Sequence, residues 1–215
     1  MGAPIVSIRT TGALERAISC LQSGKLLVVP TDTIYGIAAL PGQANIIDHL
    51  YAARGRAQEP ALPFLLASAE EMPDMARTNA HALRLAQRFW PGPLTLILPP
   101  AADLPAEYRT YPIALRVPNF APLIDLLNKM VGGRLLVTGA IRSGYPPAIT
   151  AQEAAGLLEN HVDLILDGGP SLYGIPSTIV DCVADPPVIV RRGAISDEKI
   201  RQALGLNTIA SHREP

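Results

Sequence analysis

Strand-length apolar runs alternate with segments of helical period along most of this 215-residue chain. The apolar run Leu26 to Pro30 is followed by an expected loop at Gly36 to Gln43 and by a helical segment from Ile46 to about Arg54. Short apolar runs between helices are typical of strands that are buried on both faces of a sheet. The alternation therefore predicts an α/β fold, a single-domain twisted open mixed sheet with flanking helices.

The same pattern predicts the remaining elements. Further strands are expected at Pro4 to Ile8, Leu62 to Ala67, Leu94 to Leu98, Ile113 to Val117, Arg134 to Thr138, Val162 to Leu166, Ser177 to Val183 and Val188 to Val190. Further helices are expected from Leu14 to Leu21, from Asn79 to Phe89, from Pro122 to Met130, after a capping box at Thr150 to Glu153, and from a Ser196 cap to about Leu204. Residues 1–207 are expected to form the domain and residues 208–215 a frayed tail.

Charge and composition exclude several classes of protein. The net charge is −1 and the isoelectric point is about 6.4, so no global field attracts nucleic acid or an anionic membrane. Cys20 and Cys182 are too far apart in sequence to indicate a disulfide framework or a CxxC metal site. Signal-peptide features and membrane-length apolar runs are not seen, so we expect a soluble cytoplasmic protein without membrane association.

Several familiar catalytic motifs are missing from the sequence. It contains no GxxxxGK[ST] phosphate loop, no GxGxxG fingerprint, no GxSxG elbow and no HExxH helix. Zinc, nicotinamide and serine-hydrolase chemistry therefore have no support. The residues indicate neither a catalytic side chain nor a set of metal ligands.

Polar segments that directly follow apolar strands are the candidates for a binding site. Pro30 to Gly36 reads PTDTIYG and brings hydroxyl groups to a sheet edge, where open α/β sheets bind ligands, although a hydrogen-bonded turn is the alternative. Arg54 and Arg56 are separated by one glycine, a pair suited to a phosphate or carboxylate, with a solvated helix end as the alternative.

Two further arginines follow apolar strands. Arg116 and Arg191 need anionic partners at the rim of the sheet, either a ligand or internal salt bridges to carboxylates. The candidate internal partners are Asp32, Asp167 and Asp181. Between these segments, Trp90 to Pro93 places two prolines around a glycine, which predicts a rigid structural corner.

In this order the segments resemble the YrdC family, whose characterised members are threonylcarbamoyl-AMP synthases. PTDTIYG is similar to the family's PT(D/E)TVYGL, FWPGPLTLIL to its WPGP strand and LILDGG to its aspartate-glycine-glycine turn. PSTIVD and VIVRRGAI are similar to the family's ESTVVD and VILRPGAI. The resemblance covers roughly residues 10 to 200.

The resemblance implies a nucleotidyltransferase that condenses L-threonine, bicarbonate and ATP, with Mg²⁺ on the nucleotide, to threonylcarbamoyl-AMP and pyrophosphate. A downstream tRNA-modifying complex would then use the adenylate to make threonylcarbamoyladenosine. By position, the resemblance implies that threonine contacts Thr33, Tyr35, Arg116 and Ser177. It implies that ATP contacts Arg54, Arg56, Thr138 and Arg191.

The chain departs from the family pattern at a few positions. Gly139-Ala140-Ile141 stands where the family has Ser-x-Asn, and Arg54 stands where the family has lysine. The first departure leaves two alternatives open. One is a YrdC-like protein that binds a nucleotide or double-stranded RNA without making the adenylate, and the other is a carbamoyltransferase like the YrdC-like domains of hydrogenase maturation factors.

Overall fold

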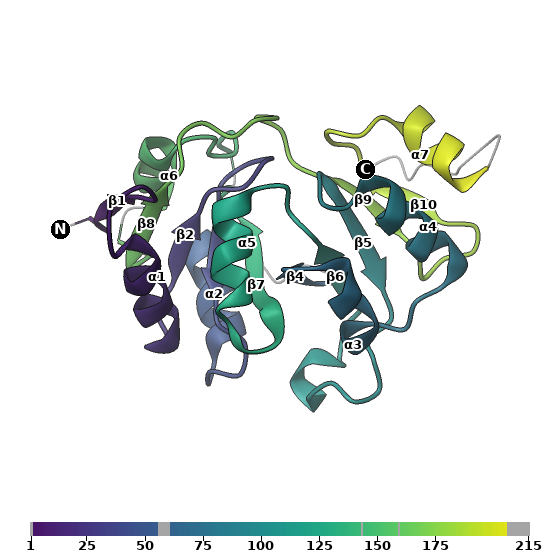
Figure 1. Cartoon of the computed structure of the whole chain (residues 1–215), viewed down its shortest axis with the longest axis horizontal. Coiled ribbons are helices and arrows are strands. Elements are labelled where there is room, and N and C mark those ends of the chain that lie inside the picture. The colour runs from purple at the N-terminus through teal and green to yellow at the C-terminus, as the bar shows by residue number, and fades with distance from the viewer. Residues whose placement is uncertain (1, 56–60, 143, 159, 206–215) are drawn as a thin grey trace.

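The computed structural model describes residues 2–55, 61–142, 144–158 and 160–205. Its strands form one ten-stranded sheet in the order β1-β8-β2-β3-β7-β4-β6-β5-β9-β10 (Figure 1). The strands are β1 Ile5–Ser7, β2 Leu27–Val29, β3 Gly36–Ala39, β4 Leu62–Leu66, β5 Leu94–Leu98, β6 Ile113–Arg116, β7 Arg134–Gly139, β8 Leu164–Asp167, β9 Thr178–Asp181 and β10 Val188–Arg191. Parallel pairs such as β4 with β6 and antiparallel pairs such as β2 with β3 make the sheet mixed, as predicted.

Helices cover both faces of this sheet. The α-helices are α1 Ala13–Gln22, α2 Ile46–Arg54, α3 Met72–Met75, α4 Ala80–Phe89, α5 Ala121–Asn128, α6 Ala151–Leu158 and α7 Asp197–Leu204. Short 3-10 turns are η1 Ala69–Glu71, η2 Ala106–Tyr108 and η3 Val131–Gly133. The α/β fold with a twisted open sheet and flanking helices is thereby confirmed, while the predicted tail at residues 208–215 lies outside the described residues.

Alternating strand residues enter two separate cores. In β2, Val28 belongs to a core that also contains residues of α2, α4 and α6, whereas Leu27 and Val29 belong to the core with α1 and α5 on the other face. Figure 1 shows α1 and α5 side by side in front of the sheet. Burial on both faces explains why these strands are continuous apolar runs.

One part of the sheet has a helix layer on a single face. Leu96, Leu115 and Val180 of β5, β6 and β9 belong to the core with α4 and α7. Their neighbours Thr95 and Ile179 lie opposite each other on the other face and are only half-buried, because α1 and α5 do not extend over them. This uncovered part of the sheet is where a ligand has access.

The predicted helix starts are confirmed by their hydrogen bonds. The side chain of Asn79 accepts from the amide of Ala82 at 2.9 Å at the start of α4. Thr150 and Glu153 form the expected capping box, in which the Glu153 amide donates to Thr150 Oγ1 at 3.2 Å and the Thr150 amide donates to Glu153 Oε2 at 3.3 Å.

The prediction of a loop at Gly36 to Gln43 is wrong for its first four residues, which form β3 in the middle of the sheet. Gly36 and the two alanines of β3 have low strand propensity, which hides the strand from a reading of the sequence. The position requires a small residue, since a Cβ on Gly36 would lie 2.6 Å from Cγ1 of Val137 on β7. The close approach of β7 therefore explains why a residue of low strand propensity occupies this position in a strand.

Candidate functional site

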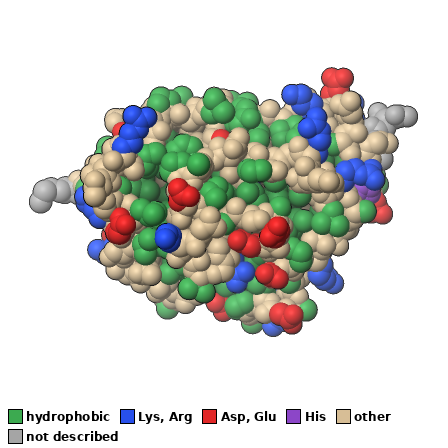
Figure 2. All heavy atoms as spheres, viewed as in Figure 1, with side chains coloured by type: hydrophobic (Ala, Val, Ile, Leu, Met, Phe, Trp, Pro, Cys, Tyr) green, Lys and Arg blue, Asp and Glu red, His purple; other side chains and the backbone are tan. Residues whose placement is uncertain are grey.

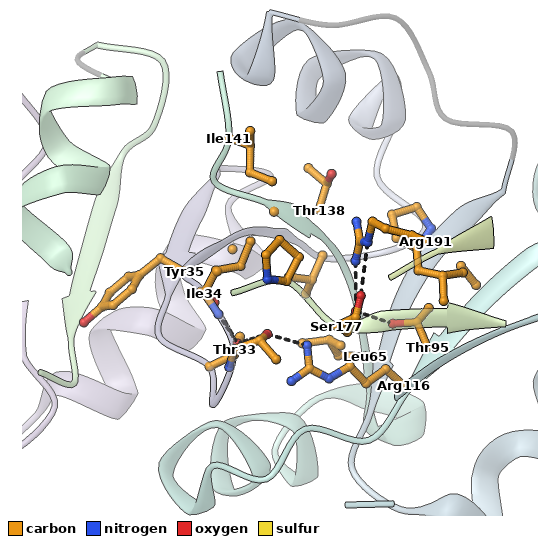
Figure 3. A pocket seen from close by; sticks show the side chains of 18 of the residues that line it. Thr33, Ile34, Tyr35, Leu65, Thr95, Arg116, Thr138, Ile141, Ser177 and Arg191 are labelled. Atoms are coloured by element: carbon orange, nitrogen blue, oxygen red, sulfur yellow. Dashed lines mark hydrogen bonds between the residues drawn. The ribbon is translucent and has the colours of Figure 1, made fainter. Parts of the chain in front are cut away.

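One pocket opens on the uncovered face and at the adjoining strand ends (Figure 3). It brings together seven of the predicted site residues, and the eighth, Arg56, lies outside the described residues. The seven are Thr33, Tyr35, Arg54, Arg116, Thr138, Ser177 and Arg191. They come from segments far apart in the sequence, so the fold gathers one polar site from separate motifs.

The loop between β2 and β3 is shaped by the hydroxyl of Thr31. This hydroxyl donates to the carbonyl of Ile34 at 2.6 Å and accepts from the amides of Thr33 and Ile34. The Thr33 hydroxyl lies 3.0 Å from it and must donate in this pair, because the single proton of Thr31 is already used. The hydrogen-bonded turn and the candidate site are thus the same structure.

The guanidinium of Arg116 is buried at the base of the pocket and held by three partners. Nε donates to the carbonyl of Gly92 at 3.0 Å, Nη1 to Thr33 Oγ1 at 2.7 Å and Nη2 to Asp32 Oδ1 at 2.5 Å. The internal salt bridge of Arg116 with Asp32 is therefore confirmed, and the same residue lines the pocket.

Burial lowers the pKa of the Arg116 guanidinium, and the adjacent Asp32 carboxylate opposes this effect. The other candidate carboxylates have structural roles. Asp167 accepts from the Gly169 amide at 2.9 Å, and Asp181 accepts from the Val183 amide at 2.8 Å. Each closes a local turn after its strand.

Ser177 connects two other pocket residues. Its hydroxyl lies 2.8 Å from Thr95 Oγ1 and accepts from Nη2 of Arg191 at 3.0 Å, while Nε of Arg191 donates to the Ser177 carbonyl at 3.1 Å (Figure 3). Gly193 allows this arrangement, because a Cβ there would collide with the carbonyl of Pro176. The VIVRRG and PST segments are therefore packed backbone against backbone.

Arg54 reaches the pocket from the C-terminal end of α2. It is 3% exposed, and its Nη1 donates to Thr138 Oγ1 at 2.9 Å near the end of β7. The alternative of a solvated helix end is wrong for Arg54, because the side chain is buried in the pocket wall. A guanidinium in such a low-dielectric position interacts strongly with an anion.

The hydroxyl of Tyr35 does not face the ligand space, although the residue lines the pocket. It donates to the Gly169 carbonyl at 2.7 Å and accepts from the Gly168 amide at 3.2 Å. Figure 3 shows the ring extending away from Thr138 and Arg116. Burial raises the pKa of this hydroxyl. Tyr35 therefore contributes backbone to the pocket and anchors the loop to the Asp167-Gly168-Gly169 turn.

An apolar wall lies beside the polar residues and consists of Ile34, Gly139 and Ile141. A Cβ placed on Gly139 would be 3.0 Å from Cδ1 of Ile34 and 3.3 Å from Cδ1 of Ile141. The two isoleucines thus occupy the space around the missing side chain. We refer to these three residues as the isoleucine wall.

The two arginines that follow the pocket segments point elsewhere. Nη1 of Arg142 is 3.4 Å from the carbonyl of Leu157, and Nε of Arg192 is 3.0 Å from Oδ2 of Asp197. Neither residue lines the pocket. On the face shown in Figure 2, Lys and Arg side chains are interspersed with Asp and Glu. The positive charge of the pocket comes from its own arginines, Arg54, Arg116 and Arg191.

The described pocket residues can bind an anion with several polar groups, and they include neither a carboxylate nor a cysteine. No cluster of three metal-ligating side chains occurs among the described residues. None of the helices that the structure describes is long and apolar enough to cross a membrane.

Reading the sequence singled out Gly139 and Ile141 as a departure from the family pattern but missed Thr95 and Ile34. Thr95 is the polar residue in the strand segment LTLIL, and that break in the apolar run is the signal that could have identified it. Ile34 gave no signal, since an isolated isoleucine normally belongs to the core.

Comparisons with known proteins found related sequences. A family model, Sua5/YciO/YrdC with the description "Telomere recombination", matches residues 19–193. A Mycobacterium tuberculosis H37Rv protein is 35% identical over 202 residues, which cover 89% of this chain and 88% of that protein. A Bacillus subtilis protein named threonylcarbamoyl-AMP synthase is 32% identical over 89% of this chain but 56% of its own length.

A solved structure has the same fold as this chain. Sua5 of P. abyssi, crystallised in complex with L-threonine, superposes with a TM-score of 0.87 at 30% identity. The match covers 98% of this chain and 63% of that protein. The chain thus spans a little over half the length of the Bacillus protein and less than two thirds of the archaeal one.

Proposed function

Because the chain belongs to the Sua5/YciO/YrdC family, we propose that it is an L-threonylcarbamoyladenylate synthase. It condenses L-threonine, bicarbonate and ATP to threonylcarbamoyl-AMP, pyrophosphate and water. The observation that carries the proposal is the convergence of three arginines with several hydroxyl groups on one pocket. These residues are Arg54, Arg116, Arg191, Thr33, Thr138 and Ser177. Such a set can neutralise a triphosphate and a carboxylate together.

In this proposal the two ends of the pocket have different ligands. The threonine end comprises Arg116 and Thr33 at the base, with Ser177 beside them. The nucleotide end comprises Arg54 with Thr138 and Arg191, and the family resemblance assigns Arg56 to the same ligand. MgATP is the nucleotide substrate, and its metal ion is held by the phosphates.

The chemistry needs positioning more than a nucleophilic side chain. The threonine amine adds to bicarbonate with loss of water, and an oxygen of the resulting carbamate attacks the α-phosphorus of ATP. The bond between the α-phosphorus and the oxygen that bridges to the β-phosphorus breaks, and pyrophosphate leaves with the bonding electron pair. The protein contributes alignment of the reactants and arginine charges near the phosphates.

A second candidate is a protein that binds a nucleotide or double-stranded RNA without forming the adenylate. The observation that favours it is the isoleucine wall, which offers only apolar side chains where the family pattern has Ser-x-Asn. RNA held by the pocket arginines would bind more weakly as salt increases and would compete with ATP. RNA and ATP bound together would reject a shared site.

The proposed cellular context follows from the proposed product. A mixed carbamic-phosphoric anhydride is reactive and must pass to an acceptor soon after release. We therefore propose that the protein works in the cytoplasm, upstream of a complex that transfers the threonylcarbamoyl group to tRNA.

Ligand-induced stabilisation separates the two candidates. A ligand that binds the native state alone raises the melting temperature by mass action. If the protein is the synthase, both ATP and L-threonine should raise the melting temperature. A folded Arg116 variant should show a smaller shift with threonine, and a folded Arg54 variant should show a smaller shift with ATP. A shift with ATP and none with threonine would favour the nucleotide-binding protein.

A further inference from the structure

The isoleucine wall joins the two ends of the pocket. Ile34 directly follows Thr33, which accepts from Arg116, and Gly139 directly follows Thr138, which accepts from Arg54. Figure 3 shows Ile34 and Ile141 on the same side of the space enclosed by Thr138, Ser177 and Arg116. A ligand that reaches both arginines therefore passes this wall.

The local backbone fixes Ile141 over Gly139. The Ala140 amide donates to the Tyr35 carbonyl at 2.8 Å, and the Ile141 amide donates to the Gly139 carbonyl at 2.8 Å in a tight turn. The Ala148 amide donates to the Ala140 carbonyl at 3.0 Å. The side chain of Ile141 is thus held where a side chain at residue 139 would otherwise lie.

We infer that the isoleucine wall binds an uncharged apolar part of the ligand, and that Ile141 sets the size of that part through its contact with Gly139. The inference rests on the proposed function for the identity of the ligands. Isoleucine side chains have no hydrogen-bonding group, so this wall selects by shape and burial. Its partner is the methyl group of L-threonine, because Ile34 directly follows Thr33, which contacts Arg116 at the threonine end of the pocket.

This chemistry sets a limit on selectivity at the wall. An apolar surface discriminates only about 10- to 200-fold between ligands that differ by one methylene group, and it cannot strongly reject an added hydroxyl. Ile141 is therefore a specificity-determining residue whose replacement changes preference between related ligands more than it changes the fold.

The test measures binding by calorimetry for the parent, Ile141→Ala, Gly139→Ala and the double variant, with L-threonine, L-serine and ATP as separate probes. Leu83→Ala is the control, because Leu83 is half exposed on α4 and lies outside the pocket. Thermal melts confirm folding. If the threonine methyl group lies on the wall, Ile141→Ala lowers the preference for threonine over serine by about fourfold, the value of one buried methyl group.

A selective loss of ATP affinity with an unchanged ratio of threonine to serine would overturn the assignment to threonine and identify the nucleotide as the occupant of the wall. Gly139→Ala should weaken threonine binding, because its Cβ would lie 3.0 Å from Cδ1 of Ile34 and 3.3 Å from Cδ1 of Ile141 and would displace both side chains. Ile141→Ala should relieve part of that effect. Unchanged affinities in all three variants, or losses equal for every probe, would overturn the inference. If the Ile141 and Gly139 substitutions change binding as expected but the parent protein releases no pyrophosphate, the inference about the isoleucine wall stands and the proposed synthase activity is rejected.

Discussion

Nε of Arg116 donates to the carbonyl oxygen of Gly92 at 3.0 Å, which ties the base of the pocket to the Trp90 to Pro93 corner. The corner is itself held, since the indole of Trp90 donates to the Leu94 carbonyl at 2.7 Å and the Gly92 amide donates to the Val117 carbonyl at 2.9 Å. The tryptophan-proline-glycine-proline motif is thus structural, as predicted, and what it positions is a pocket arginine.

Gly92→Ala should destabilise the protein, because the new Cβ would collide with the carbonyl of Phe89. We expect a loss of about 1 to 3 kcal/mol in the free energy of unfolding, the usual cost of overpacking. Urea denaturation measures it. The matched control is Gly156→Ala in α6, where nothing lies within 4 Å of the added Cβ. That control should be neutral or stabilising, and equal losses in both variants would contradict this account.

Arg116→Ala should affect both stability and threonine binding. It leaves the buried Asp32 carboxylate without its guanidinium partner, which costs about 3 to 5 kcal/mol, so denaturation should show a large loss. Arg116→Lys retains the charge without the fork and serves as the folded variant for calorimetry. Its threonine affinity should fall while its ATP affinity stays nearly unchanged. Equal losses for both ligands would place Arg116 elsewhere in the site.

The fold was predictable because most strands are apolar on both faces, and the caps at Asn79, Thr150 and Ser196 mark helix starts. The strand at Gly36–Ala39 was not predictable, because its small residues are required by the close approach of a neighbouring strand and have low strand propensity. The gathering of site arginines followed from their positions at strand and helix ends. The directions of the side chains could not be predicted from the sequence. The hydroxyl of Tyr35, for example, points away from the pocket and donates to the Gly169 carbonyl.

Arg54→Ala should weaken ATP binding and leave threonine binding unchanged. Loss of a charge-assisted hydrogen bond costs about 1.5 to 3 kcal/mol, so the dissociation constant should rise roughly 10- to 150-fold. Arg192→Ala is the matched control, since that arginine is exposed and bonds to Asp197. Calorimetry of both variants is the measurement. An unchanged ATP affinity in folded Arg54→Ala, or an equal loss in the control, would remove Arg54 from the nucleotide end.

The two cysteines should react slowly in the native protein. Burial, with a smaller contribution from Asp163, raises the pKa of Cys20 to about 11. Burial followed by the Asp181 charge raises the pKa of Cys182 to about 12. Since the thiolate is the reactive form, labelling with a disulfide reagent at pH 8 should be at least about 100-fold slower in buffer than in urea. Rapid native labelling of either thiol would contradict the buried positions.

Pyrophosphate release from ATP tests the central claim most directly. The account predicts release that requires both L-threonine and bicarbonate, is strongly reduced in Arg116→Lys and Arg54→Ala, and is retained in Arg192→Ala. Mass spectrometry of the product should find the threonylcarbamoyl adenylate. A folded protein that binds ATP and threonine but releases no pyrophosphate, or that releases it equally without threonine, would contradict the proposed function.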